Sequence, residues 1–314
     1  MKQIFSLFLL LSFFVPGVLA KQPAELAPPS LPKLAEQKFN GHDFQVKKIL
    51  AREKAYTRYL ITYKSADLTI SGIMNLPKGD GPFPVLILAH GYINPKYYTV
   101  GRGLKREQDY FASRGYLVIH PDYRNHGLSD KDPESQDHFR LGYVEDVINV
   151  VYAVRASDKG YFDKENIGLM GHSLGGGIAL NIMVTQPKLV KAISLYAPVS
   201  ADYYDNFNRW IRRGRPDVAQ KIIDQHGSLE SNPKFWRELS AINYLDKVAL
   251  PILLQHGTAD ESCPVEWSDR LARELKAAKK NITFERYDGG KHEFIKYWPA
   301  FMKKNVEFFD EYLK

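Results

Sequence analysis

The stretch that decides the fold runs from Ile167 to Gly177 and reads I-G-L-M-G-H-S-L-G-G-G. Its first four residues are apolar or small and are typical of a short buried strand. A helical pattern follows to about residue 186. The G-x-S-x-G sequence of residues 171–175 therefore lies at a strand–turn–helix junction, where a tight turn exposes the serine hydroxyl to a substrate. Because that context is much rarer than the five-residue pattern alone, it predicts Ser173 as a nucleophile.

Two more side chains complete a predicted catalytic set. A serine hydroxyl becomes a good nucleophile only when a base takes its proton. His292 follows a predicted strand at 281–287, and Asp260 follows a predicted strand at 251–256. Both side chains are then expected at the carboxyl edge of the sheet, with Ser173. We predict His292 as the general base and Asp260 as the acid that orients it.

A loop after an earlier strand is the predicted source of an oxyanion donor. The apolar run at 85–89 is typical of a strand buried on both faces, and His90-Gly91 begins the loop that follows it. We predict that the backbone N–H groups of Tyr92 and Leu174 stabilise the oxyanion, an interaction worth roughly 3–4 kcal/mol for one donor.

Other reactive side chains near strand ends have a structural interpretation. Asp122 is a rival for the acid, and we expect it to be structural and paired with Arg124. Cys263 has no obvious base beside it and is predicted to be a spectator. The remaining histidines near strand ends are expected to be structural hydrogen-bonding residues: His90, His120, His126, His172 and His256.

Strand and helix patterns alternate along most of the chain, which predicts an α/β fold with a mostly parallel central sheet and helices on both faces. An antiparallel hairpin, 56–63 with 68–76, is predicted before it. Residues 200–245 show helical stretches without a strand pattern, and we interpret them as a small cap over the carboxyl edge. Two alternatives stay open for the cap aromatics, which either line an apolar pocket or form the core of the cap: Tyr203, Tyr204, Trp210 and Trp236.

The first twenty residues resemble an export signal. Lys2 precedes an uncharged run from Ile4 to Val15, and small residues end at Ala20. We predict a secretory signal peptide cleaved after Ala20, because the run is too short for the ~20 residues of a membrane-spanning helix. The predicted domains are the signal peptide at 1–20, a flexible leader at 21–40 and one catalytic domain at 41–314. The protein is expected to be secreted or periplasmic.

Composition excludes several function classes. The 314 residues carry a net charge of +7, and the chain has a single cysteine, so a disulfide within the chain and a cysteine-rich zinc site are ruled out. We predict no cofactor, no metal and no nucleic-acid partner, since no corresponding motif is present. The densest basic run contains Arg209, Arg212, Arg213 and Arg215. It is interpreted as a solvated helix face, with a preference for acidic substrates as the alternative.

From about residue 56 to residue 313 the chain resembles the α/β-hydrolase superfamily, and within it the catalytic domain of the prolyl oligopeptidase family of serine peptidases. The resemblance rests on residues 120–124 (HPDYR), 171–176 (GHSLGG), 240–248 (SAINYLDKV), 256–260 (HGTAD) and 290–294 (GKHEF). It implies the same three catalytic residues that the spacing indicates. Two features depart from the family: about 50 residues precede the core, where relatives carry a β-propeller, and the oxyanion loop reads His90-Gly91-Tyr92-Ile93 instead of His-Gly-Gly-Pro.

Three functional hypotheses remain after the sequence alone. The first is an exported serine hydrolase that cleaves a peptide or amide bond in small substrates through an acyl-enzyme. The second is a carboxylesterase that acts on small acyl or sugar esters with the same residues. The third is an inactive hydrolase fold that binds ligands, which the complete set Ser173, Asp260 and His292 argues against.

Overall fold

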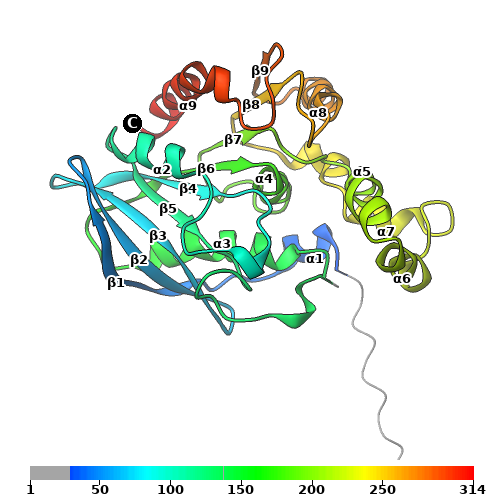
Figure 1. Cartoon of the computed structure of the whole chain (residues 1–314), viewed down its shortest axis with the longest axis horizontal. Helices are drawn as coiled ribbons and strands as arrows, with labels where there is room; N and C mark the ends of the chain where they lie inside the picture. Colours follow the sequence, from blue (N-terminus) through cyan, green and yellow to red (C-terminus); the bar gives the residue numbers. More distant parts are fainter. Residues whose placement is uncertain (1–28, 137) are drawn as a thin grey trace, which may run out of the picture.

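The computed structural model describes residues 29–136 and 138–314, so the predicted signal peptide at 1–20 lies outside the described residues. Within that part of the chain, nine strands form one sheet (Figure 1). They are β1 (His42–Arg52), β2 (Tyr56–Ser65), β3 (Leu68–Pro77), β4 (Phe83–Ala89), β5 (Leu117–Pro121), β6 (Phe162–His172), β7 (Ala192–Tyr196), β8 (Ile252–Gly257) and β9 (Ile282–Tyr287). Their order is β1-β2-β3-β5-β4-β6-β7-β8-β9.

The sheet is antiparallel at one end and parallel over the rest. β1, β2, β3 and β5 pair antiparallel in succession, whereas each neighbouring pair from β5 to β9 is parallel. The central parallel strands are buried on both faces because helices cover them, and β4 and β5 accordingly carry nearly continuous apolar runs. The predicted mostly parallel sheet with helices on both faces is confirmed.

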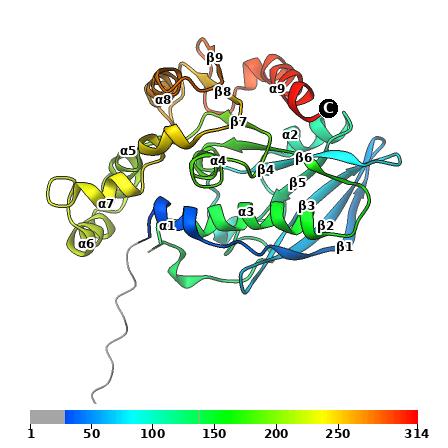
Figure 2. The same cartoon turned by 180° about the vertical axis from the view of Figure 1, so that it is seen from behind.

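Helices cover the two faces unequally. One face carries α2 (Lys105–Ala112) and α9 (Trp298–Leu313), whose Phe111, Phe301 and Phe309 belong to one buried cluster. The other face carries α3 (Leu141–Ala156), α4 (Leu174–Thr185) and α8 (Val265–Ala277), which contribute to a larger buried cluster. Figures 1 and 2 show these two layers from opposite sides.

The chain changes direction across the sheet at β4. β5, which follows β4 in the sequence, pairs on one side of it, and β6 pairs on the other side. Such a switch point opens a crevice at the carboxyl ends of the two central strands, where ligands bind in open α/β sheets. The loops after β4 and β6 both leave their strands at this edge.

Two segments near the beginning of the described chain differ from the prediction. Residues 31–36 of the predicted flexible leader form helix α1 (Leu31–Glu36), and Leu31 and Leu34 are buried in the larger core cluster. Ser30 caps this helix by accepting a hydrogen bond from the Lys33 N–H at 3.4 Å, and a proline follows in the first turn, which favours helix initiation. The leader prediction is wrong for these residues, because their apolar side chains find a partner surface on the folded domain.

β1 is the second difference. The predicted hairpin is confirmed as β2 and β3, but a further antiparallel strand, β1, precedes it and pairs with β2. β1 pairs with β2 along its length but buries only Phe44. A strand with most of its side chains in water carries little hydrophobic alternation, so its sequence does not distinguish it from a loop.

Residues 200–245, all of them described, contain helices and no strand, as predicted. The segment comprises α5 (Tyr203–Asn206), a π-helical turn (Phe207–Arg212), α6 (Pro216–His226), α7 (Pro233–Glu238) and the start of a 3₁₀ segment (Ala241–Lys247). These helices project to one side of the molecule, beyond α4 and α8 (Figure 1). We call residues 200–245 the cap.

The cap has its own aromatic core. Trp236 and Phe207 are buried with ring centroids 4.7 Å apart, and Tyr204 packs on Trp236 at 5.0 Å. Trp210 is 39% exposed and packs against Trp267 of α8. Of the two alternatives for the cap aromatics, Trp236 is therefore core. Among the residues described, no helix combines the length and the apolar character needed to cross a bilayer.

Candidate active site

Ser173 occupies a strained turn between β6 and α4. Its φ of 55° and ψ of −116° lie in a sparsely populated region, which costs a non-glycine residue on the order of 1–3 kcal/mol. The surrounding backbone holds this conformation: the Ser173 N–H donates to the Tyr196 carbonyl at 3.0 Å, and the Ser173 carbonyl accepts from Gly177 and Val199 at 3.1 Å each. The predicted strand–turn–helix setting is therefore present.

The two glycines of the G-x-S-x-G sequence, Gly171 and Gly175, are required because a side chain at either position would clash with the backbone. A Cβ atom at Gly171 would lie 2.2 Å from the Gly175 carbonyl oxygen, and one at Gly175 would lie 2.0 Å from the Ala89 carbonyl oxygen. Both distances are far below a van der Waals contact. The turn thus approaches its own helix on one side and the end of β4 on the other, so only glycine fits at either position.

Asp260 accepts four hydrogen bonds at the carboxyl edge of the sheet. It follows β8, and its side chain is fully buried. One carboxylate oxygen, Oδ1, accepts the backbone N–H groups of Ser262 and Cys263, each at 2.8 Å. The other, Oδ2, accepts His292 Nδ1 at 2.8 Å and His256 Nε2 at 3.1 Å. Burial by itself would raise the pKa of Asp260, but the hydrogen bonds from the two histidines and from the backbone hold it well below its usual range.

His292 is thereby held in one orientation. It follows β9 and is 14% exposed, with Nδ1 directed at the Asp260 carboxylate. A carboxylate oxygen only accepts, so Nδ1 carries the proton and the lone pair of Nε2 faces away from Asp260. The structure therefore brings two of the three predicted catalytic residues into direct contact, in the geometry that a general base requires.

His172 packs beside this base as a neutral ring. Its imidazole lies 4.7 Å from that of His292 and 4.1 Å from the ring of Tyr196. Burial, followed by the neighbouring His292, lowers the pKa of His172 to about 3. His172 thus has a structural role through its ring contacts, whereas its buried Nε2 lacks, among the described residues, the hydrogen bond that was predicted for this residue.

The loop after β4 passes directly beside Ser173. A Cβ atom at Gly91 would lie 3.2 Å from the Ser173 Cβ. His90 Nδ1 donates to the Gly91 carbonyl at 2.7 Å. Because the peptide is planar and trans, the N–H of Tyr92 in the same peptide unit points away from His90. Leu174 begins α4, where the first N–H groups lack partners within the helix.

His90 is itself a structural residue, as predicted. Burial lowers its pKa to about 4, and its ring stacks on Tyr123 at 4.2 Å. It keeps the Gly91 carbonyl in place and so orients the predicted oxyanion donor at Tyr92. His126 supports the same loop, with Nε2 3.0 Å from the Ile93 carbonyl oxygen.

The predicted pairing of Asp122 with Arg124 is wrong. Asp122 accepts hydrogen bonds from the Tyr98 hydroxyl at 2.7 Å and the Ser71 hydroxyl at 2.5 Å. Burial raises its pKa despite these hydrogen bonds. Arg124 points elsewhere because three other carboxylates surround it: Asp132, Glu145 and Asp146. Asp122 is structural, but its partners come from β3 and the loop after β4.

Cys263 and His256 both contact the predicted catalytic acid, Asp260, although Cys263 was predicted to be a spectator. The cysteine is fully buried, its N–H binds Asp260, and its carbonyl accepts from His256 Nε2 at 2.9 Å. Burial and the nearby Asp260 raise the pKa of its thiol to about 12, against an opposing hydrogen bond with Ser173. The thiol is therefore protonated and adjacent to the nucleophile, and its backbone helps to hold the acid.

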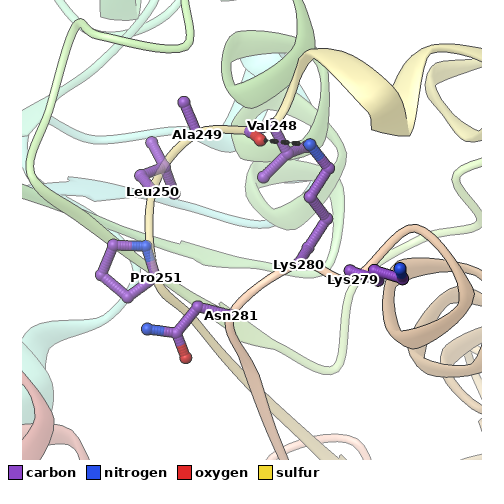
Figure 3. Close-up of a pocket in the computed structure, with 7 residues that line it drawn as sticks. All are labelled: Val248, Ala249, Leu250, Pro251, Lys279, Lys280 and Asn281. Atoms are coloured by element: carbon purple, nitrogen blue, oxygen red, sulfur yellow. Dashed lines mark hydrogen bonds between the residues drawn. The ribbon is translucent and has the colours of Figure 1, made fainter.

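A separate hollow of about 270 Å³ lies at the opposite edge of the sheet (Figure 3). It is lined by residues 248–251, just before β8, and 279–281, just before β9. Lys280 spans it, donating to the carbonyls of Asp246 and Val248 at 2.7 and 2.8 Å. The hollow is thus at the amino ends of these strands, away from Ser173, and its ammonium group is already engaged.

Known proteins with similar sequences include a peptidase and esterases. Residues 103–314 match the prolyl oligopeptidase family. The chain is 26% identical over 243 residues to "Uncharacterized peptidase YuxL" of Bacillus subtilis, covering 74% of this chain and 35% of that protein. It is also 26% identical over 157 residues to "Esterase FrsA" of Shigella boydii, covering 48% of this chain and 35% of that protein. The chain thus spans about a third of the length of these curated relatives.

Solved structures show the same fold. Acetyl xylan esterase 1 from Thermoanaerobacterium sp. superposes with a TM-score of 0.67 at 15% identity, over 88% of this chain and 93% of the esterase. The acylaminoacyl peptidase of Pyrococcus horikoshii superposes with a TM-score of 0.65 at 23% identity, over 84% of this chain and 43% of the peptidase. The α/β-hydrolase fold expected from the sequence is confirmed.

Proposed function

The chain belongs to the prolyl oligopeptidase family, and we propose that it is a serine hydrolase that cleaves a peptide or amide bond in small substrates. The observation that carries the proposal is the Asp260–His292 hydrogen bond at the sheet edge where Ser173 occupies its strained turn. The 26% identity to a peptidase over 74% of the chain favours the amide bond as the substrate.

The proposed reaction begins with attack by the Ser173 hydroxyl on the substrate carbonyl. His292 Nε2 takes the hydroxyl proton, and the Asp260 carboxylate stabilises the imidazolium that forms. The backbone N–H groups of Tyr92 and Leu174 bind the oxyanion. The tetrahedral intermediate collapses when His292 returns the proton to the leaving amine. A water molecule, activated by the same histidine, then hydrolyses the acyl-enzyme and restores the Ser173 hydroxyl.

A carboxylesterase with the same residues is the second candidate. The superposition on an acetyl xylan esterase over 88% of this chain and 93% of that enzyme favours it. The chemistry differs only in the leaving group, which is an alcohol instead of an amine. An alcohol departs more readily. The site residues and their roles are otherwise those of the peptidase proposal.

The test is kcat/KM on a matched ester and amide that share one acyl group. We expect the wild type to cleave both, and Ser173→Ala to lose both activities. Ser113→Ala is the control, because Ser113 is exposed and its hydroxyl donates to the Asp109 carbonyl of its own helix. Cleavage of the ester alone would favour the esterase. No Ser173-dependent turnover of either substrate would leave the third hypothesis, a ligand-binding hydrolase fold.

We further propose that the protein is exported. The charge at Lys2, the uncharged run from Ile4 to Val15 and the small residues before Lys21 support this proposal. Sequencing the amino terminus of the protein from its native host is expected to show Lys21 as the first residue. Recovery of the intact terminus from the cytoplasm would refute export.

A further inference from the structure

Arg209 of the cap forms hydrogen bonds with the loop that follows Asp260, the predicted catalytic acid. It lies on the π-helical turn Phe207–Arg212, a type of irregularity often found at functional sites. Its Nε donates to the Ser262 carbonyl at 2.6 Å, and its Nη2 donates to the Glu261 carbonyl at 2.7 Å. The guanidinium carbon also lies 5.9 Å from the centre of the Trp267 ring. The fork of the guanidinium thus spans two successive carbonyl groups.

The same two peptide groups bind Asp260 at their other ends. The Glu261 carbonyl shares a peptide unit with the Ser262 N–H, and the Ser262 carbonyl shares one with the Cys263 N–H. Both N–H groups donate to Asp260 Oδ1 at 2.8 Å. Each planar peptide therefore has the guanidinium at its carbonyl end and the carboxylate at its N–H end. Hydrogen bonds linked in this way polarise one another, so a positive charge on the carbonyls strengthens the N–H donors.

We propose that Arg209 is a positioning residue for the catalytic acid and that it couples the cap to the active site. It acts through two peptide dipoles on Oδ1 of Asp260, and this leaves Oδ2 directed at His292. The proposal rests on the serine hydrolase function proposed above. The interpretation of the basic run as a solvated helix face does not hold for Arg209. It holds for the exposed helical residues Arg212 and Arg213, whereas Arg215 is exposed but lies outside a helix, at the N-cap of α6.

Loss of the guanidinium has a definite consequence in this arrangement. The loop 261–263 would lose the two charge-assisted bonds that hold its carbonyls, and these are the stronger kind of hydrogen bond. Asp260 would then be held less firmly against His292. A misplacement of the catalytic groups by about 1 Å can cost on the order of 10²-fold in rate, without a corresponding effect on substrate binding.

The experiment compares three variants of the full chain. Arg209→Met removes the guanidinium and keeps most of the apolar stem. Arg209→Lys keeps the charge but lacks the fork that holds two carbonyls. Arg213→Met is the matched control, because it removes an arginine from the same segment at an exposed position. We expect kcat on the small ester to fall about ten- to hundredfold in Arg209→Met, to fall less in Arg209→Lys, and to be unchanged in Arg213→Met, with KM little altered throughout.

A double-mutant comparison separates a positioning role from a general loss of structure. When Asp260→Asn is already present, Arg209→Met is expected to have little further effect on kcat, because both changes act on the same carboxylate. If the two changes multiply, Arg209 does not act through Asp260 and the proposal is wrong. An unchanged kcat in Arg209→Met would also overturn it.

Hydrogen exchange gives a readout that does not depend on turnover. The amides of Ser262 and Cys263 are expected to exchange faster in Arg209→Met than in the wild type or in Arg213→Met. If the wild type shows no Ser173-dependent turnover, the proposed function fails, and this comparison still decides whether Arg209 holds the loop. Equal exchange in all three proteins would refute the positioning role.

Discussion

The substitution Gly175→Ala is the most direct perturbation of the nucleophile turn. A Cβ atom at this position would lie 2.0 Å from the Ala89 carbonyl oxygen and 2.8 Å from that of His90. Side-chain Cβ atoms essentially never approach a heavy atom closer than 3.0 Å. Either the turn or the end of β4 must therefore move by roughly 1 Å, since both obstacles are backbone atoms. The first movement displaces Ser173, and the second displaces the loop that carries Tyr92.

The size of the effect follows from that displacement. A shift of about 1 Å between nucleophile and oxyanion donor is expected to lower kcat/KM by on the order of 10²-fold. Overpacking at a buried site also costs about 1–3 kcal/mol of folding free energy. Gly214→Ala is the matched control, because nothing lies within 4 Å of its would-be Cβ and its backbone is helical. It is expected to raise the free energy of unfolding by about 0.5–1 kcal/mol and to leave turnover unchanged.

The assay measures hydrolysis of an aryl ester together with urea unfolding for the wild type and both variants. Loss of activity in a Gly175→Ala protein that still unfolds cooperatively would place the effect at the turn. If Gly175→Ala retained wild-type kcat/KM, the close approach between the turn and β4 would not position the nucleophile, and the steric reasoning would be refuted.

Three further predictions concern buried polar groups. Asp260→Asn is expected to lower kcat by on the order of 10⁴-fold, because an amide N–H facing His292 favours the wrong tautomer of the imidazole. The pKa of Asp260 is depressed in the folded protein, so the stabilisation that its carboxylate contributes is present above pH ~4 and is lost as the pH falls further. The difference in unfolding free energy between wild type and variant, measured with urea, is therefore expected to shrink in acid. Arg124→Met is expected to lower the free energy of unfolding, measured with urea, by about 3–5 kcal/mol, because it leaves the fully buried Asp146 without its guanidinium partner at 2.9 Å. A decrease below about 1 kcal/mol would contradict this account. The Cys263 thiol is expected to resist a chromogenic disulfide reagent in the native protein and to react on unfolding, because it is fully buried and its pKa is raised to about 12. Rapid labelling of the native protein would contradict this prediction and show that the site opens readily.

Local patterns in the sequence were sufficient for the parallel part of the sheet and for the strand ends at which the predicted catalytic residues lie. Ser173, Asp260 and His292 each follow a parallel strand, and the carboxyl ends of such strands meet at one edge whatever the details of packing. The strand and helix periods that carry this prediction involve only residues close together in the chain. For the same reason, the polar exposed strand β1 and the short helix α1 gave too little periodic signal to be recognised.

Tertiary structure alone decided which side chains surround those residues. Arg209 lies more than fifty residues from the carbonyls it binds, and Asp122 binds Tyr98 and Ser71 instead of its sequence neighbour Arg124. These contacts depend on where the cap and the antiparallel strands come to rest against the parallel sheet. Hydrogen bonds and buried charges are specified by distances of a few ångströms in the folded chain, whereas the sequence alone specifies the local periods and turns from which that chain is built.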